Sequence, residues 1–145
     1  MLMYIKVCHN KQVGLGLQAV TKLPKGTKIA YYMGTIWTTK TAKEKGKERY
    51  SHFLTVPGTG CSIDGSPIHL FDEAFPPLDK TFLVPCPLMS LTNSSTNYKQ
   101  PNCKMIVKQE ARIYTDGNWL DKTIYLVAMR DIEPYEELIW SYTYM

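Results

Sequence analysis

Several familiar signatures are absent from this sequence of 145 residues. No apolar run reaches the roughly 18 residues of a membrane-spanning helix, and the first ten residues lack the anatomy of a signal peptide. We therefore expect no membrane insertion and a reducing environment for the thiols. The chain has only four cysteines, which lie far apart and form no C-x-x-C pair. Because zinc ligands usually come in close pairs, we predict no metal site and interpret the cysteines as packing residues.

The best-known catalytic motifs are also missing. The chain contains no G-x-S-x-G, no P-loop and no H-E-x-x-H, which argues against the hydrolases, nucleotide-binding enzymes and zinc proteases that carry them. A Gly14-x-Gly16 pair is present, but it lacks the third glycine of a dinucleotide-binding turn. By itself such a pair indicates only a tight turn.

What the chain does contain is typical of one globular domain. Apolar residues make up 44% and charged residues 21%, and a chain of this length buries about two-thirds of its surface on folding. We predict a single domain over residues 1–145. The 10 tyrosines, 3 tryptophans and 4 phenylalanines exceed what a core requires. The net charge of +4 is mild, and we interpret the lysine-rich stretch 40–49 as a solvated face, so direct nucleic-acid binding is not expected.

The spacing of β-forming residues and turn signals predicts a mostly β fold with a few short helices. Five prolines between residues 66 and 87 indicate an ordered insertion or loop, and residues 88–93 suit a helical turn. We expect a glycine-kinked turn that leads into a strand within 13–20, and a hairpin of 53–56 with 61–63. The other expected strands are 4–7, 28–33 continued by 35–38, 104–110, 111–114 joined by a turn to 123–128, and 138–140.

Four short patterns follow one another along the chain. The first is Gly14-Leu15-Gly16-Leu17-Gln18-Ala19, with Tyr32-Met33-Gly34 about a dozen residues later, and the second is Ile63-Asp64-Gly65. The third is Leu91-Thr92-Asn93-Ser94-Ser95, followed by Pro101-Asn102-Cys103. The fourth reads IEPYEELIWSY over residues 132–142. Each pattern alone is unspecific, but four in this order are hard to attribute to chance.

This series resembles the SET-domain lysine methyltransferases, whose patterns run GxGLxA with YxG, IDA, NHSCxPNC and I-x-x-GEELxxDY. The resemblance covers residues 13–142. It implies a single SET domain of short β-sheets, with a knot-like threading of the C-terminal segment and an insert region at about 66–88. It further implies a protein-lysine N-methyltransferase that uses S-adenosyl-L-methionine and acts on histone tails. Such a substrate would place the protein in the nucleus or on host chromatin.

The same resemblance implies the site residues. In the family, the G-x-G turn lies against the methionine part of the cofactor, an Asn-His pair lies beneath it, and a tyrosine is catalytic. Tyr142 matches that tyrosine. The residues matched to the cofactor site are Leu15, Gly16, Leu17, Asn93, Ser94 and Tyr142. The candidates for the channel that receives the substrate lysine are Trp140, Tyr144 and Tyr50.

Lysine chemistry accounts for these residue types. A free lysine has a pKa near 10.4, so its ammonium group must lose a proton before the amine can attack a methyl group. An apolar, aromatic channel disfavours the charged amine, and the positive sulfonium of the cofactor acts in the same direction. A tyrosine hydroxyl can then orient the amine. No metal or covalent intermediate is needed.

The chain departs from the family pattern at several positions. Ser94 replaces the histidine, Ser141 replaces the aspartate before the tyrosine, and Tyr135 replaces the glycine before the two glutamates. No cysteine-rich post-SET segment follows Tyr142, so we expect the insert or a second copy of the chain, in a homodimer, to close the lysine channel. The acidic residues expected to attract a basic tail are Asp64, Asp72, Glu73 and Asp79.

Three interpretations follow from the sequence. The first is an active protein-lysine methyltransferase. The second, motivated by Ser94 and Ser141, is a catalytically degenerate SET domain that binds a peptide or the cofactor without turnover. The third is a basic, β-rich nucleic-acid module, which explains none of the four patterns.

Overall fold

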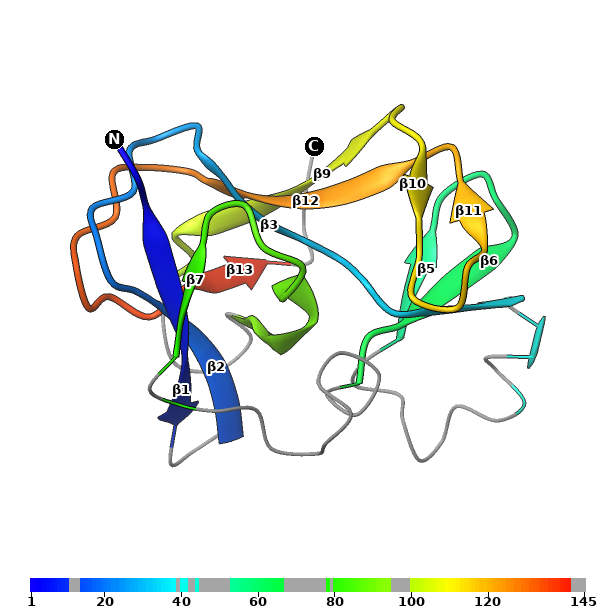
Figure 1. The fold of residues 1–145 in the computed structure, drawn as a ribbon, viewed down its shortest axis with the longest axis horizontal. Coiled ribbons are helices and arrows are strands. Elements are labelled where there is room, and N and C mark those ends of the chain that lie inside the picture. The colour runs from blue at the N-terminus through cyan, green and yellow to red at the C-terminus, as the bar shows by residue number, and fades with distance from the viewer. Residues whose placement is uncertain are drawn as a thin grey trace.

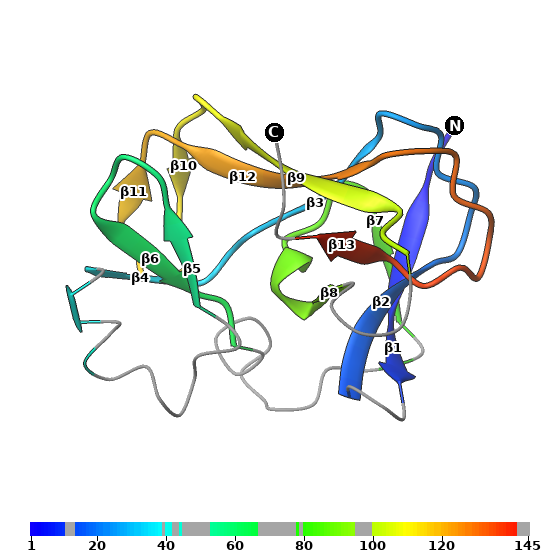
Figure 2. The same ribbon diagram turned by 180° about the vertical axis from the view of Figure 1, so that it is seen from behind.

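Short strands in four small sheets make up most of the fold (Figures 1 and 2). The structure is a computed structural model that describes residues 1–10, 14–38, 40–41, 44, 53–66, 78, 80–94 and 100–141. The mostly β class predicted from the sequence is therefore confirmed. Within the described ranges, no helix has the length and apolar character needed to cross a membrane. The lysine-rich stretch 40–49 lies mainly outside these ranges.

The central sheet has five strands in the order β3-β12-β9-β13-β8. Strand β12, the second in this order, is buried along its whole length and pairs antiparallel with β3 and β9. Strand β13 runs parallel to both β9 and β8, which places the C-terminal pattern between two earlier segments of the chain. In Figures 1 and 2, β9 and β12 run along one long side of the molecule. The strand bounds are β3 Lys28–Tyr31, β12 Thr123–Ala128, β9 Cys103–Lys108, β13 Ile139–Ser141 and β8 Asn93–Ser94.

A second sheet, β2-β1-β7, lies at one end of the molecule (Figure 1). Its strands are β1 Tyr4–Asn10, β2 Gly14–Ala19 and β7 Thr81–Leu83. The strand expected within 13–20 is confirmed as β2, but Gly14 and Gly16 lie inside this strand and not in a turn before it, with Gly16 opposite Cys8 of β1. Strand β7 was also not expected. It forms inside the proline-rich segment because β1 offers an edge to pair with.

The third sheet, β4-β6-β5, lies at the other end (Figures 1 and 2). Its strands are β4 Thr35–Thr38, β6 Cys61–Asp64 and β5 Phe53–Val56. The predicted hairpin of 53–56 with 61–63 is confirmed. The predicted continuity of 28–33 with 35–38 is wrong, because β3 and β4 belong to different sheets. Gly34 between them packs so tightly that a Cβ there would lie 1.9 Å from the carbonyl oxygen of Asp64.

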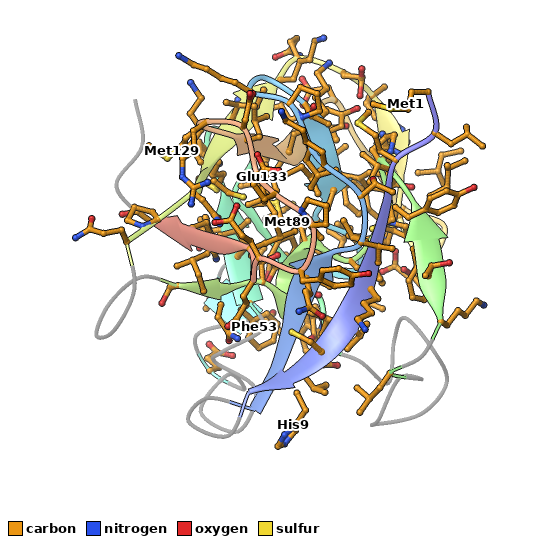
Figure 3. All side chains as sticks on the ribbon, turned by 90° about the vertical axis from the view of Figure 1, so that its left-hand side faces the viewer. Met1, His9, Phe53, Met89, Met129 and Glu133 are labelled. Atoms are coloured by element: carbon orange, nitrogen blue, oxygen red, sulfur yellow. The ribbon has the colours of Figure 1, made fainter. Side chains whose placement is uncertain are left out.

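Two smaller elements complete the described fold. Strands β10 Arg112–Ile113 and β11 Trp119–Leu120 form a two-stranded sheet. The turn at 115–118 therefore joins β10 to β11, and not directly to β12 as predicted. The expected helical turn at 88–93 is confirmed as the 3-10 helix η3, Met89–Leu91. Figure 3 shows Met89 among the packed side chains and His9 projecting from the end of β1.

The core draws apolar side chains from three of the sheets and from η3, and two of the four cysteines are buried in it. Cys86 and Cys103 are 3% and 0% exposed, and this burial raises the pKa of each thiol from 9.0 to about 12. They are packing residues, as predicted. Cys8 and Cys61 are half-buried, and none of these four described cysteines forms a disulfide bond.

We expect the protein to lose stability above about pH 9. The unfolded chain releases these two thiol protons near pH 9, whereas the folded chain holds them to about pH 12. Each thiol then favours unfolding by about 1.4 kcal/mol per pH unit, so the stability it contributes is complete below pH 9 and is lost towards pH 12. Urea unfolding at pH 8, 9.5 and 10.5 measures this decline. A Cys86→Ala, Cys103→Ala double variant should decline less steeply, and an equal slope would contradict the assignment.

Candidate functional site

The first, third and fourth sequence patterns meet at Gly16. The Asn93 side chain donates a hydrogen bond from Nδ2 to Oε2 of Glu137 at 3.0 Å. A Cβ on Gly16 would lie 2.7 Å from each of these two atoms and 3.4 Å from Sγ of Cys8. Real side chains essentially never make so short a contact, so this position has room only for glycine. We call Gly16, Asn93 and Glu137 the glycine junction.

The two glycines of the G-x-G pattern serve different purposes. Gly14 has a φ of +90°, a left-handed conformation that favours glycine, but a Cβ there would meet nothing within 4 Å. Gly16 is required for space and not for a left-handed backbone. The sequence predicted a close approach at this turn, and the atoms that approach within the described structure are the side chains of Asn93 and Glu137.

Asn102 holds the Glu137 segment in place. Its Nδ2 donates to the carbonyl of Glu137 at 2.9 Å, and its Oδ1 accepts the backbone N–H of Ile139 at 2.8 Å. Its backbone N–H donates to the carbonyl of Ile139, and its carbonyl accepts the N–H of Met129, both at 2.9 Å. Three polar groups of this 4% exposed residue thus fasten the β13 segment beside β9, and its carbonyl binds the residue that follows β12.

The second pattern packs against the Tyr32-Met33-Gly34 segment and η3. A Cβ on Gly65 would lie 2.5 Å from Cβ of Ser90 and 2.9 Å from Cε1 of Tyr32. The Ser90 hydroxyl donates to the carbonyl of Gly65 at 2.6 Å. Where the family pattern has alanine, this chain therefore needs glycine. These contacts position η3, which leads directly into Asn93.

Asp64 is fully buried, so the expectation that it attracts a basic tail is wrong. Its Oδ1 accepts the backbone N–H of Ser66 at 3.2 Å, which turns the chain after β6. A sequence pattern cannot distinguish this structural carboxylate from an exposed one. The other acidic candidates, Asp72, Glu73 and Asp79, lie outside the described residues.

The remaining candidates can be placed in part. Leu15 and Ser94 are half-buried, and Leu17 is fully buried in the core. Trp140 is 3% exposed, pairs in register with Ser94, and donates from Nε1 to the carbonyl of Thr92 at 3.2 Å. The buried Thr92 hydroxyl has no hydrogen-bond partner among the described residues. The candidates outside the described residues are Tyr50, Tyr142 and Tyr144.

Tyr135 takes the backbone conformation of the glycine it replaces. Its φ is +71°, and it is the one non-glycine residue in the described ranges with a positive φ. For a bulky residue this conformation costs on the order of 1 kcal/mol or more. The backbone N–H of Tyr135 donates to the carbonyl of Ala19 at 2.8 Å, and its carbonyl accepts Nε2 of Gln18 at 2.8 Å. These contacts to β2 hold the strained residue in place.

Sequence reasoning did not assign roles to Glu137 and Asn102. Both lie inside the third and fourth patterns, so the signal was present, but their contacts join segments 35 to 44 residues apart. Asn102 is buried, whereas Asn93 and Glu137 are both half-buried and place an amide and a carboxylate beside Gly16. Such a group can hold a ligand that carries positive charge.

Comparison with known proteins agrees with this arrangement. The SET domain family model matches residues 14–143. A putative histone methyltransferase of Plasmodium falciparum superposes with a TM-score of 0.60 at 14% identity, covering 97% of this chain and 94% of that one. ATXR5, in complex with mono-methylated histone H3.1, gives 0.63 at 16% identity, covering 95% of this chain and 56% of that one. No curated protein sequence matches the chain. The glycine junction, the strand order around it and the family match together show that the chain belongs to the SET-domain family.

Proposed function

We propose that the protein is a protein-lysine N-methyltransferase that uses S-adenosyl-L-methionine and acts on histone tails. The observation that carries the proposal is the glycine junction. Three patterns from distant parts of the sequence meet there, at Gly16 of β2, Asn93 of β8 and Glu137 just before β13. The family membership and the fold of the two methyltransferase-like neighbours support the same conclusion.

The residues at the junction fit the charge of this cofactor. S-adenosyl-L-methionine carries a positive ammonium group and a positive sulfonium, and when bound it supplies the methyl group. The half-buried carboxylate of Glu137 offers a negative partner for such a ligand. Because Asn93 uses its Nδ2 on Glu137, its Oδ1 is the atom that can accept from an ammonium group. Leu15 and Ser94 are half-buried and adjoin Gly16 and Asn93 in the sequence, and we expect them to line the rest of the cofactor site.

The proposed lysine channel follows β13. Trp140 is fixed by its pairing with β8 and β9 and by the bond from its indole to Thr92, which gives one rigid apolar wall. We propose that Tyr142, two residues later, orients the substrate amine, with Tyr50 and Tyr144 as further channel residues. An apolar aromatic wall disfavours the ammonium form of lysine and so helps it to lose the proton. A histone tail as substrate is supported by the histone H3.1 complex of the similar ATXR5 structure.

Replacing Tyr142 by phenylalanine tests the catalytic assignment. We expect Tyr142→Phe to lower the rate of tritium transfer from labelled S-adenosyl-L-methionine to mixed core histones by about 10- to 100-fold, because the amine loses its orienting hydroxyl. Cofactor affinity, measured by calorimetry, should change little. Tyr135→Phe is the matched control, since this tyrosine is 69% exposed and should keep the full rate. An unchanged rate in Tyr142→Phe would show that another residue orients the lysine.

The same assay separates the enzyme from a degenerate SET domain. Ser94 and Ser141, which replace a histidine and an aspartate of the family pattern, are the features that favour a binding module. Cofactor binding without transfer to any histone or histone peptide would establish that alternative. Methyl transfer to non-histone proteins alone would support the methyltransferase activity and contradict histones as the substrate.

A further inference from the structure

A second chemical feature lies on the outer face of the central sheet, formed by β3, β12 and β9 and by the start of β10. We call Lys28, Lys104, Lys108 and Arg112 the basic face. Lys28 and Lys104 both pair in register with Val127 of β12, one from each side, and Lys108 pairs with Thr123. Directly paired residues point to the same side of a sheet, so these lysines share one face. In Figures 1 and 2, strands β9 and β12 of this sheet run along the long side of the molecule.

Two tyrosine rings hold the cations in position. The Arg112 guanidinium lies 3.8 Å from the ring centroid of Tyr31, and Nζ of Lys28 lies 4.9 Å from that of Tyr125. The two rings meet edge to face with centroids 6.2 Å apart. Arg112 also donates from Nε to the Thr123 hydroxyl at 3.3 Å. Contacts between cations and aromatic faces are attractive, so Lys28 and Arg112 are fixed against the sheet.

The positive charge on this face is only partly compensated. Glu110 accepts a hydrogen bond from the Tyr125 hydroxyl, and its Oε2 lies 3.5 Å from Nη2 of Arg112. Among the described residues, no carboxylate lies within ion-pair distance of Lys28, Lys104 or Lys108. The side-chain contact with Lys108 lowers the pKa of Lys28; burial and the repulsion between the two like charges act in the same direction, and the charge of Glu110 opposes them. Holding three such cations together on one face is unfavourable until an anion binds.

We propose that the basic face binds the phosphate backbone of nucleic acid. Strands lie about 4.8 Å apart and rise about 3.3 Å per residue, so the four cations cover an area of roughly 10 by 13 Å. An array of this size suits the regularly spaced charges of one nucleic-acid strand better than the irregular charges of an acidic peptide. The tyrosine rings are covered by the cations, which leaves phosphate contacts and no base stacking, so binding should be independent of sequence. The proposal does not depend on methyl transfer.

The sequence did not suggest this surface. Its one lysine-rich stretch, 40–49, drew attention to a different part of the chain, and nucleic-acid binding was not expected. The four cations come from strands β3, β9 and β10, and only the register of the sheet brings them together.

Salt dependence of binding to a fluorescein-labelled 20-base-pair duplex tests the proposal. If three cations of the basic face contact phosphates, raising NaCl from 50 to 200 mM should lower the affinity for the duplex roughly 40-fold, measured by fluorescence anisotropy. Lys104→Gln with Lys108→Gln removes two exposed cations and should weaken binding at 50 mM salt at least 10-fold. In this double variant, which keeps one phosphate contact, the same rise in salt should lower the affinity only about 3- to 4-fold. Lys6→Gln with Lys80→Gln, on β1 and beside β7, is the control with the same loss of net charge.

Two further measurements make the test decisive. Glu110→Gln removes the single carboxylate beside Arg112 and should strengthen duplex binding, which a general loss of folding could not do. Polyglutamate of matched charge should bind at least 10-fold more weakly than the duplex. Equal binding of polyglutamate, or an equal loss in the control double variant, would overturn the proposal. Methyl transfer to isolated histone peptides should be unchanged in Lys104→Gln with Lys108→Gln, so a failure here leaves the proposed function standing.

Discussion

Replacing Gly16 by alanine is expected to reduce methyl transfer by more than about 100-fold. The new Cβ would lie 2.7 Å from both Nδ2 of Asn93 and Oε2 of Glu137, so at least one of these side chains must move by several tenths of an ångström. Their mutual hydrogen bond of 3.0 Å would then be broken or re-aimed. Small displacements of positioning groups commonly cost two orders of magnitude in rate. The loss should already be visible as weaker binding of S-adenosyl-L-methionine in calorimetry.

Gly14→Ala is the matched control for this experiment. It makes the same chemical change two residues away on the same strand, but a Cβ at Gly14 meets nothing within 4 Å. Its cost comes from the φ of +90°, which alanine adopts poorly, and should be about 1 kcal/mol of folding stability. Gly14→Ala should therefore melt earlier but bind cofactor normally. Normal cofactor affinity in Gly16→Ala would show that the junction does not form the cofactor site.

These two glycines also show how far sequence reasoning reaches. The resemblance predicted that the cofactor approaches the G-x-G segment closely, which stays a prediction, and the structure shows that the side chains of Asn93 and Glu137 approach Gly16. The pattern could not show that Gly14 is glycine because of its backbone conformation, since residue identities alone do not give dihedral angles. The hairpin of 53–56 with 61–63 was predictable because its turn residues lie between its two strands in the sequence.

The strand continuity at Gly34, strand β7 and the burial of Asp64 were missed because each depends on a distant partner. The run from Lys28 into β4 reads as one strand, but Gly34 must pack against the carbonyl of Asp64, which sends the chain into a second sheet. Strand β7 forms in a proline-rich segment only because β1 has a free edge. Asp64 reads as an exposed acid and is fully buried. Strand formation and burial depend on the neighbouring strand in the sheet, and a single sequence does not show which segment pairs with which.

Asn102→Ala is expected to destabilise the protein by about 3 to 5 kcal/mol, the largest stability effect of any single amide in the described structure. The change leaves the carbonyl of Glu137 and the N–H of Ile139 without their partners. Each buried, unsatisfied backbone group costs about 1 to 3 kcal/mol. Because these bonds fasten β13 to β9, the loss should also lower cofactor affinity through Glu137. Asn118→Ala, which truncates an exposed amide in the 115–118 turn, should cost less than about 1 kcal/mol.

Asn102→Asp distinguishes hydrogen bonding from shape at this position. The new carboxyl group has nearly the same size, and one oxygen can still accept the N–H of Ile139, but the other would face the carbonyl of Glu137. Two acceptors repel, and a carboxylate at a 4% exposed position is costly, so its pKa should be raised above that of an ordinary aspartate. Protonation restores a donor towards Glu137. The stability deficit, measured by urea unfolding against the native protein at each pH, should therefore be smaller at pH 5 than at pH 7.5. No deficit in either variant would show that β13 is held by its sheet pairing alone, and an Asn102→Asp deficit that is the same at both pH values would contradict the role of the donated hydrogen bond.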